Sequence, residues 1–180
     1  VLLLFFLSFG WLLTSTRCSY DVLGVDVFPG YVDAINDKSL HSTEPRVMEF
    51  LQSSKNLKAT VSFQEGIDHS DVYFIFVATP STGGERHYDH TALGKVLADI
   101  NRRKVSNKHV IIGCTVIPGY IAQTGRFLLR DCTNTSLSYN PEFICQGDII
   151  AGLLKPDMVL IGEGSKEAGA YLEQLYKDHC

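Results

Sequence analysis

The sequence has little of what metal-binding, disulfide-stapled or nucleic-acid-binding proteins need. Its five cysteines are odd in number and widely spread, and no two form a C-x-x-C pair, which argues against a zinc site and a disulfide framework. The six histidines show no H-x-x-H or H-E-x-x-H spacing, so we predict no metal site. The net charge is −4 and the one basic run is residues 102–104, so nucleic-acid binding has no support.

Long hydrophobic runs are also scarce, and the one that occurs covers residues 1–13. It has the length of a secretory h-region, about 7–15 residues, but no positive charges precede it. It falls short of the roughly 18–20 residues of a membrane span. Two further interpretations are a buried strand and helix of the domain, and residues that are not native to it, as after a frameshift. The cysteine usage predicts a cytoplasmic protein; a genuine targeting segment would make it membrane-tethered or secreted.

The remaining chain alternates short apolar runs with amphipathic segments. Strands are predicted over 21–26, 57–63, 72–77, 109–113, 136–139 and 157–162. Helices are predicted over 29–36, 44–53, 64–69, 91–103, 121–129, 146–154 and 165–177. This order predicts an α/β, Rossmann-like domain over residues 20–180, with a mainly parallel sheet and helices on both faces. Residues 1–19 stand apart as an apolar segment of uncertain origin.

Asp26 ends the first of these apolar runs. An Asp at the end of the second strand of a nucleotide-binding βαβ unit can accept both hydroxyls of an adenosine ribose, whereas a 2′-phosphate would meet a like charge. Asp26 therefore indicates NAD rather than NADP. The alternative is an ordinary strand-end turn Asp.

Small and hydroxyl residues follow the next two predicted central strands. Residues 78–84 combine Ala, Thr, Pro, Ser and Gly, which lets a cofactor approach the backbone closely; a flexible loop is the alternative. Thr115 follows the strand 109–113, and we expect it beside the loop after Val77. Its hydroxyl could hold a water or a cofactor group, or it could bond its own turn backbone.

Asn140-Pro141-Glu142-Phe143 places a carboxylate on a turn after the strand 136–139. Pro141 fixes its own φ and keeps Asn140 extended. Because open α/β sheets carry their chemistry at the carboxyl ends of strands, Glu142 is a candidate catalytic residue. The alternative is a first-turn helix residue that the helix dipole favours.

Taken in order, these segments resemble the N-terminal half of the nucleotide-sugar 6-dehydrogenases, of which UDP-glucose 6-dehydrogenase is the type. The resemblance covers about residues 20–177 and is carried by six blocks: Val25-Asp26-Val27, Glu44-Pro45, Val77-Ala78-Thr79-Pro80-Ser81, Thr115-Val116-Ile117-Pro118-Gly119, Asn140-Pro141-Glu142-Phe143 with Gly147, and Pro156-Asp157-Met158-Val159-Leu160-Ile161-Gly162. Each block is weak alone, but together at the family's spacing they are specific.

The resemblance implies an NAD-dependent, two-step oxidation of a sugar C6 alcohol to a carboxylate. Thr115 and Glu142 would position and activate the catalytic water. The cofactor would contact Asp26, Tyr31, Val77, Ala78, Thr79, Pro80, Ser81, Cys114, Thr115, Val116 and Gln146. The nucleotide sugar would contact Glu142, Phe143, Ile144, Cys145 and Gln146. Within this family, the motif Pro141-Glu142-Phe143 favours UDP-glucose as the substrate, with GDP-mannose as the alternative. It disfavours the N-acetylhexosamine substrates of other members.

The chain departs from the family's pattern in four ways. The glycine-rich phosphate turn expected roughly 20 residues before Asp26 is replaced by residues 3–13, with only Gly10, which favours a non-native origin for that segment. Gln146 replaces the family's second acid, and Arg46 replaces the Gly after the Glu-Pro pair. The family's helical and C-terminal domains, with the catalytic Cys, are missing from these residues.

From these departures we expect a fragment that is inactive alone. Homo-oligomers are expected only of a full-length protein. The other interpretation is a non-catalytic, Rossmann-like partner subunit.

Overall fold

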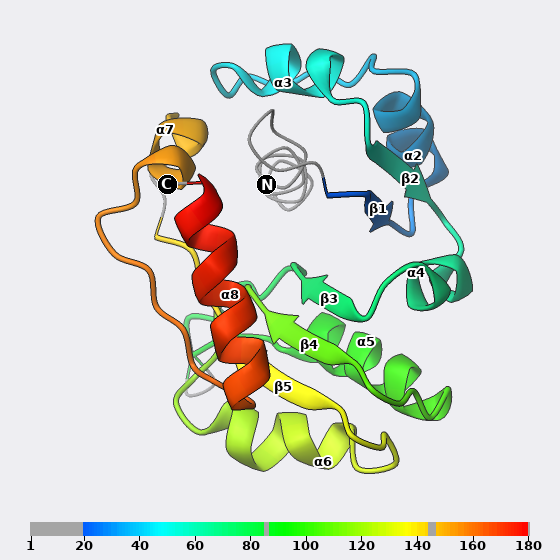
Figure 1. The fold of residues 1–180 in the computed structure, drawn as a ribbon, viewed down its shortest axis with the longest axis vertical. Coiled ribbons are helices and arrows are strands. Elements are labelled where there is room, and N and C mark those ends of the chain that lie inside the picture. Colours follow the sequence, from blue (N-terminus) through cyan, green and yellow to red (C-terminus); the bar gives the residue numbers. More distant parts are fainter. Residues whose placement is uncertain (1–19, 85–86, 144–146, 180) are drawn as a thin grey trace. The chain divides into compact units, whose positions relative to one another are not determined.

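A computed structural model describes residues 20–84, 87–143 and 147–179 (Figure 1). Parallel strands alternate with helices along the chain, which confirms the predicted fold class. The elements are β1 (Val22–Val25), α2 (Pro29–Asn36), α3 (Val47–Ser53), β2 (Leu57–Thr60), α4 (Phe63–His69), β3 (Val72–Ile75), α5 (Thr91–Arg102), β4 (His109–Ile112), η1 (Ile121–Gly125), α6 (Arg126–Leu128), β5 (Ser136–Tyr139), α7 (Ile149–Leu154) and α8 (Lys166–His179).

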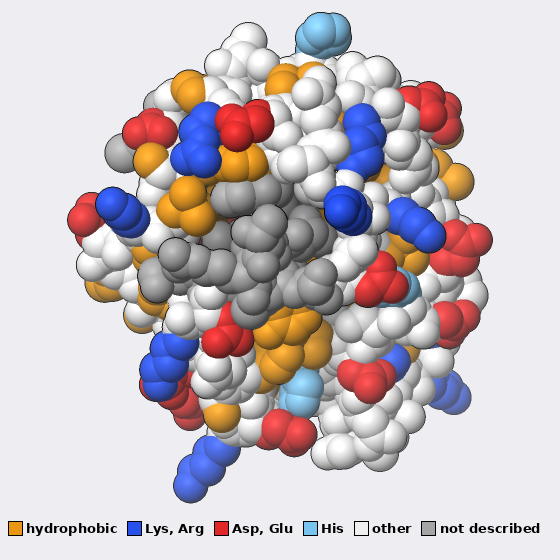
Figure 2. All heavy atoms as spheres, turned by 45° about the horizontal axis from the view of Figure 1, so that its top comes forward, with side chains coloured by type: hydrophobic (Ala, Val, Ile, Leu, Met, Phe, Trp, Pro, Cys, Tyr) orange, Lys and Arg blue, Asp and Glu red, His pale blue; other side chains and the backbone are white. Residues whose placement is uncertain are grey.

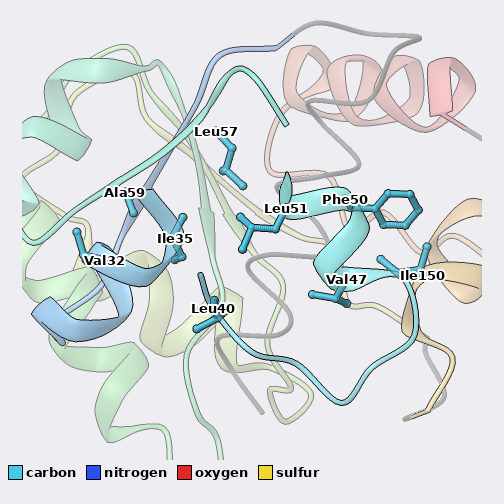
Figure 3. Close-up of a cluster of buried hydrophobic side chains, with 9 residues drawn as sticks. All are labelled: Val32, Ile35, Leu40, Val47, Phe50, Leu51, Leu57, Ala59 and Ile150. Atoms are coloured by element: carbon cyan, nitrogen blue, oxygen red, sulfur yellow. The ribbon is translucent and has the colours of Figure 1, made fainter. Parts of the chain in front are cut away.

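The chain folds as two compact units. The first comprises residues 1–70, 143–159 and 174–180, and its sheet pairs β1 with β2 in parallel, with Val22 opposite Leu57. A cluster of buried apolar side chains from α2, α3, β2 and α7 forms its core (Figure 3). The members are Val32, Ile35, Leu40, Val47, Phe50, Leu51, Leu57, Ala59 and Ile150. Helix α7 is therefore tied to α3 although about a hundred residues separate them in the sequence.

The second unit comprises residues 71–142 and 160–173, and its sheet has the order β3-β4-β5, all parallel. After His109, central strand β4 is apolar, and Val110, Ile111 and Ile112 are fully buried. That pattern is typical of a parallel strand covered on both faces. Helix α5 contributes the fully buried Leu93 and Leu97, which lie on its apolar stripe four residues apart.

One predicted strand does not form. Residues 157–162 make only an isolated antiparallel bridge, in which Tyr139 and Gly162 exchange both backbone hydrogen bonds. The Leu160 carbonyl accepts from the Asn140 side-chain amide at 3.0 Å, so it is not available to a neighbouring strand. Met158 stays exposed, and its apolar character misled the prediction.

Two helix boundaries also differ from the prediction for local reasons. Helix α3 begins at Val47, three residues late, because Arg46 adopts a left-handed backbone with φ of +67°. The predicted helix 121–129 begins as the π-helical turn η1 and continues as α6. Within the described part of the chain, no helix is long and apolar enough to cross a bilayer. The apolar run 1–13 lies outside the described residues.

Candidate active site

The carboxyl edge of the β3-β4-β5 sheet brings the predicted site residues of the second unit together. Ile75 pairs with Ile112, and Ile112 pairs with Tyr139, so the three strands end in one row. Thr115 lies three residues beyond Ile112, and Glu142 lies three residues beyond Tyr139. The Asn140 N–H donates to the Ile112 carbonyl at 2.9 Å, which continues the alignment past the strand ends. Thr115 and Glu142 therefore leave neighbouring parallel strands at the same edge, as the sequence predicted.

Glu142 is the most perturbed acid in the described part of the chain. Both carboxylate oxygens are buried, and neither has a hydrogen-bond partner among the described residues. The residue as a whole is half-buried, and its carboxyl end is covered. Burial raises the pKa of Glu142 from 4.5 to about 8, because desolvation disfavours the charged form. At neutral pH the side chain is therefore mainly a neutral acid that can lose its proton with little change of pH.

Thr115 is exposed, and in the described part of the chain its hydroxyl makes no hydrogen bond to its own turn. Its neighbour Cys114 is a half-buried free thiol that bonds the Val77 backbone. Burial raises the pKa of Cys114, and the Val77 bond offsets part of that effect. The thiol thus stays protonated and unreactive. Its bond joins the Val77 loop to the Thr115 loop, which the sequence predicted to be neighbours.

A group of aromatic residues that no sequence motif had indicated lies around these loops. Burial raises the pKa of Tyr139, although a hydrogen bond from the Val116 backbone lowers it in part. Burial also raises the pKa of Tyr120, and the ring of His90 lies 4.6 Å from the Tyr120 ring. The His90 Nε2 atom is buried without a hydrogen-bond partner among the described residues. Tyr139 was detectable, since it is the last residue of a predicted strand.

Backbone hydrogen bonds hold part of the loop after Val77 in a turn. Ser81 and Tyr88 form an antiparallel bridge, and the Asp89 N–H donates to the Pro80 carbonyl at 2.9 Å. Gly83 takes a positive φ of +68°, which a glycine adopts without strain. Ala78, Pro80 and Ser81 are exposed and Thr79 is half-buried, so this stretch can be reached from solvent. Its cofactor contacts remain a prediction.

Asp26 lies at the carboxyl end of β1 in the first unit. Its Oδ1 accepts the Phe28 N–H at 2.9 Å, so the carboxylate caps its own turn, as the alternative interpretation predicted. Val27 is 82% exposed and Phe28 61% exposed, and the Phe28 ring meets the Tyr31 ring edge-on at 5.7 Å. An acceptor beside open apolar and aromatic surface fits the adenosine end of a dinucleotide.

Three of the predicted contact residues, Ile144, Cys145 and Gln146, lie outside the described residues. Phe143, just before them, is exposed. Side chains of both charges are scattered over the face drawn in Figure 2. No group of three or more His, Cys, Asp or Glu able to hold a metal ion occurs in the described ranges.

Comparisons with known proteins agree with this arrangement. Residues 10–180 match the family model "UDP-glucose/GDP-mannose dehydrogenase family, NAD binding domain". The chain is 32% identical over 174 residues to a GDP-mannose 6-dehydrogenase of Pseudomonas syringae pv. tomato, covering 88% of this chain and 39% of that protein. It is 29% identical over 151 residues to a UDP-glucose 6-dehydrogenase of Rickettsia conorii, covering 81% of this chain and 34% of that protein.

The crystal structure of a ternary complex of GDP-mannose dehydrogenase from Pseudomonas aeruginosa aligns with a TM-score of 0.83 at 28% identity. That alignment covers 96% of this chain and 41% of the other. The chain thus spans about two fifths of the length of the relatives that it matches. We conclude from the family match and the row of strand-end residues that the chain belongs to the UDP-glucose/GDP-mannose dehydrogenase family and corresponds to its NAD-binding domain.

Proposed function

We propose that this chain is the cofactor-binding part of an enzyme that oxidises the C6 alcohol of a nucleotide-linked hexose to a carboxylate with NAD. The observation that carries the proposal is Glu142, whose buried carboxyl has no partner among the described residues and stands at the same sheet edge as Thr115. A buried acid without a structural partner reduces stability, so its presence in a strand-end loop favours a chemical role.

The reaction defines what this edge must do. Converting a CH₂OH group and one water to a carboxylate transfers two hydrides to the oxidant and releases three protons, and the water supplies the added oxygen atom. NAD, when bound, supplies the hydride acceptor. We assign the proton handling to Glu142, because an acid with a pKa of about 8 can both release and take up a proton near neutral pH. The exposed Thr115 hydroxyl would hold the attacking water beside it.

The substrate is the finer part of the proposal. The Pro141-Glu142-Phe143 motif led us to expect UDP-glucose, with GDP-mannose as the alternative. The relatives named GDP-mannose 6-dehydrogenase reach 32% identity, against 29% for those named UDP-glucose 6-dehydrogenase. We therefore test GDP-mannose first and keep UDP-glucose as the second candidate.

Calorimetric titration of the chain with NAD, and then with each nucleotide sugar, tests the proposal. We expect the wild type to bind a nucleotide sugar and Glu142→Ala to weaken that affinity about tenfold, as loss of one hydrogen bond would. NAD affinity should not change in this variant. Glu163→Ala, which removes an exposed carboxylate of the same unit, is the matched control.

Failure of both nucleotide sugars to bind would contradict the dehydrogenase function and favour the non-catalytic partner subunit. Micromolar binding of NAD would support the proposed function, and it would show that the cofactor binds without the glycine-rich turn that residues 3–13 replace.

A further inference from the structure

Asn140 is a buried polar residue that lies two positions before Glu142. It is 2% exposed, and its side-chain amide donates to the Leu160 carbonyl at 3.0 Å. Its backbone N–H donates to the Ile112 carbonyl of β4 at 2.9 Å. Asn140 is therefore tied to β4 through its backbone and to the segment 160–164 through its side chain.

Two further contacts join the same end of β5 to the segment 160–164. Tyr139 and Gly162 exchange both backbone hydrogen bonds, at 2.9 Å and 2.7 Å. The Gly164 N–H donates at 3.0 Å to the hydroxyl of Ser138, which is fully buried. The strand end and this segment belong to the same compact unit. The end of β5 is therefore held on both sides, by β4 and by the segment 160–164.

Buried polar residues are concentrated at this strand end. Three polar residues are buried in the described part of the chain, and two of them are Ser138 and Asn140. Burying a polar group costs free energy unless it is hydrogen-bonded, and apolar side chains would fill these positions without that cost. A hydrogen-bonded polar pair instead makes the local structure rigid and specific. This indicates that the pair fixes the conformation of the strand end.

Glu142 needs a fixed support because its carboxyl is buried without a partner among the described residues. An ionised carboxylate in that position would gain free energy by moving into water. The turn that carries Glu142 must therefore resist this movement. Pro141 is the one residue between Asn140 and Glu142, and its ring fixes its own φ. Few free rotations thus separate the held residue from the acid.

We propose that Asn140 is a positioning residue that keeps the Glu142 carboxyl in place at the carboxyl edge of the β3-β4-β5 sheet. It acts through Glu142 and does not itself contact the substrate. This inference rests on the proposed function, which assigns the proton handling to Glu142. It adds the residue that determines where that acid stands.

Three single substitutions test this role. Asn140→Ala removes the donor to the Leu160 carbonyl. Ser138→Ala removes one neighbouring acceptor, and this milder change keeps the test valid if Asn140→Ala does not fold. Asn101→Ala is the matched control, because it removes two hydrogen bonds between the Asn101 side chain and Asp131, at 2.8 Å and 2.9 Å, near the end of α5 in the same unit.

The first measurement is the titration of the Glu142 carboxyl by carbon NMR in the purified chain. In Asn140→Ala we expect the pKa of Glu142 to fall from about 8 toward 4.5, because a released turn lets water reach the carboxylate. Ser138→Ala should shift it less in the same direction, and Asn101→Ala should leave it unchanged. Urea unfolding shows which variants are folded, so that a general loss of stability is not mistaken for this shift.

The second measurement is the affinity for GDP-mannose by calorimetry. Asn140→Ala should lower this affinity by up to about tenfold, the loss that we expect for Glu142→Ala. If Asn140 acts through Glu142, the double variant with both substitutions should bind no more weakly than Glu142→Ala alone.

The inference and the proposed function fail in different ways. An unchanged pKa of Glu142 in every folded variant of Asn140 and Ser138 would overturn the positioning role, whatever the ligands do. A further tenfold loss of affinity in the double variant would also overturn it, because Asn140 would then act independently of Glu142. If the wild type binds neither GDP-mannose nor UDP-glucose, the proposed function fails, and the titration still decides whether Asn140 holds the carboxyl.

Discussion

Asp26 and Glu142 are two carboxylates that each follow a parallel strand, one in each unit, and their surroundings differ. Asp26 accepts a hydrogen bond from its own turn and lies next to side chains that are more than half exposed. Glu142 has both oxygens buried and no partner among the described residues. Solvated acids suit the recognition of ligand hydroxyls, whereas desolvated acids suit proton transfer. The difference supports a binding role for Asp26 and a chemical role for Glu142.

The largest expected effect comes from disturbing the packing of β5, the strand that precedes Glu142. A Cβ on Gly164 would lie 2.3 Å from the Leu137 carbonyl oxygen, and the Gly164 N–H bonds the Ser138 hydroxyl on the same strand, β5. Because a backbone atom cannot move aside, Gly164→Ala should lower the free energy of unfolding by about 3 kcal/mol or more. Chemical denaturation measures this.

Gly30→Ala is the control, since a Cβ at Gly30 in α2 would meet nothing within 4 Å. It should be neutral or stabilise by up to about 1 kcal/mol, because alanine favours a helix over glycine. Equal destabilisation by the two variants would show that β5 is not packed as described.

The next effect concerns the charge of Glu142. Its folded-state pKa is raised to about 8, so the stability that the protonated acid contributes is fully present below 4.5 and is lost as the pH rises through 8. Glu142→Gln cannot ionise and should escape this loss. At pH 9 we expect it to exceed the wild type in stability by about 2 kcal/mol or more.

Urea unfolding at pH 5, 7 and 9 measures this difference. At pH 5 the free energies of unfolding of the wild type and of Glu142→Gln should agree within error. A wild type and a Glu142→Gln variant with parallel pH profiles would contradict the burial of this carboxyl.

A smaller effect is expected when the charge of Asp26 is removed. Asp26→Asn keeps an acceptor for the Phe28 N–H but loses the charge that we expect at the adenosine ribose. NAD affinity should fall about tenfold, which corresponds to the loss of one hydrogen bond to a charged group. Fluorescence or calorimetric titration measures this. Discrimination against NADP should weaken as well, and an unchanged preference would remove the assignment of Asp26 to the ribose.

The smallest effect concerns Arg46, where the family pattern has Gly. Arg46 holds a left-handed φ of +67°, and its guanidinium lies 4.5 Å from the centre of the Phe50 ring. Glycine would relieve about 1 kcal/mol of backbone strain but would remove the cation–π contact, which is worth about 0.5 kcal/mol at an exposed site. We expect Arg46→Gly to stabilise the protein by about 0.5 kcal/mol, measured as a shift of the denaturation midpoint. Clear destabilisation would mean that the ring contact outweighs the strain.

Much of the fold was predictable because local pattern and tertiary burial agree. The strand His109–Ile112 is apolar and fully buried at its last three positions. Helix α2 begins at Pro29, whose fixed φ suits a first turn. The common edge of Thr115 and Glu142 also follows from sequence, since parallel strands end on the same side of a sheet.

The remaining features depend on contacts that sequence spacing does not encode. Residues 158–160 have the composition of a strand, but the Asn140 side chain takes the Leu160 carbonyl, a pairing across 20 residues. Whether an acid at a strand end is solvated, as Asp26 is, or buried, as Glu142 is, depends on what packs over it. The Gly147 N–H donates to the Glu44 carboxylate, and these residues are 103 positions apart. Nothing in their sequence spacing indicates this hydrogen bond.

The most direct test of the account is the titration of Glu142 itself. Carboxyl-carbon NMR of the chain, with the Glu142 resonance assigned by its absence from Glu142→Gln, gives the pKa of this one residue. Our account predicts a pKa of about 8, set by burial without a partner. A pKa near the ordinary 4.5 would show that the carboxylate is solvated, and the chemical role assigned to this sheet edge would lose its support.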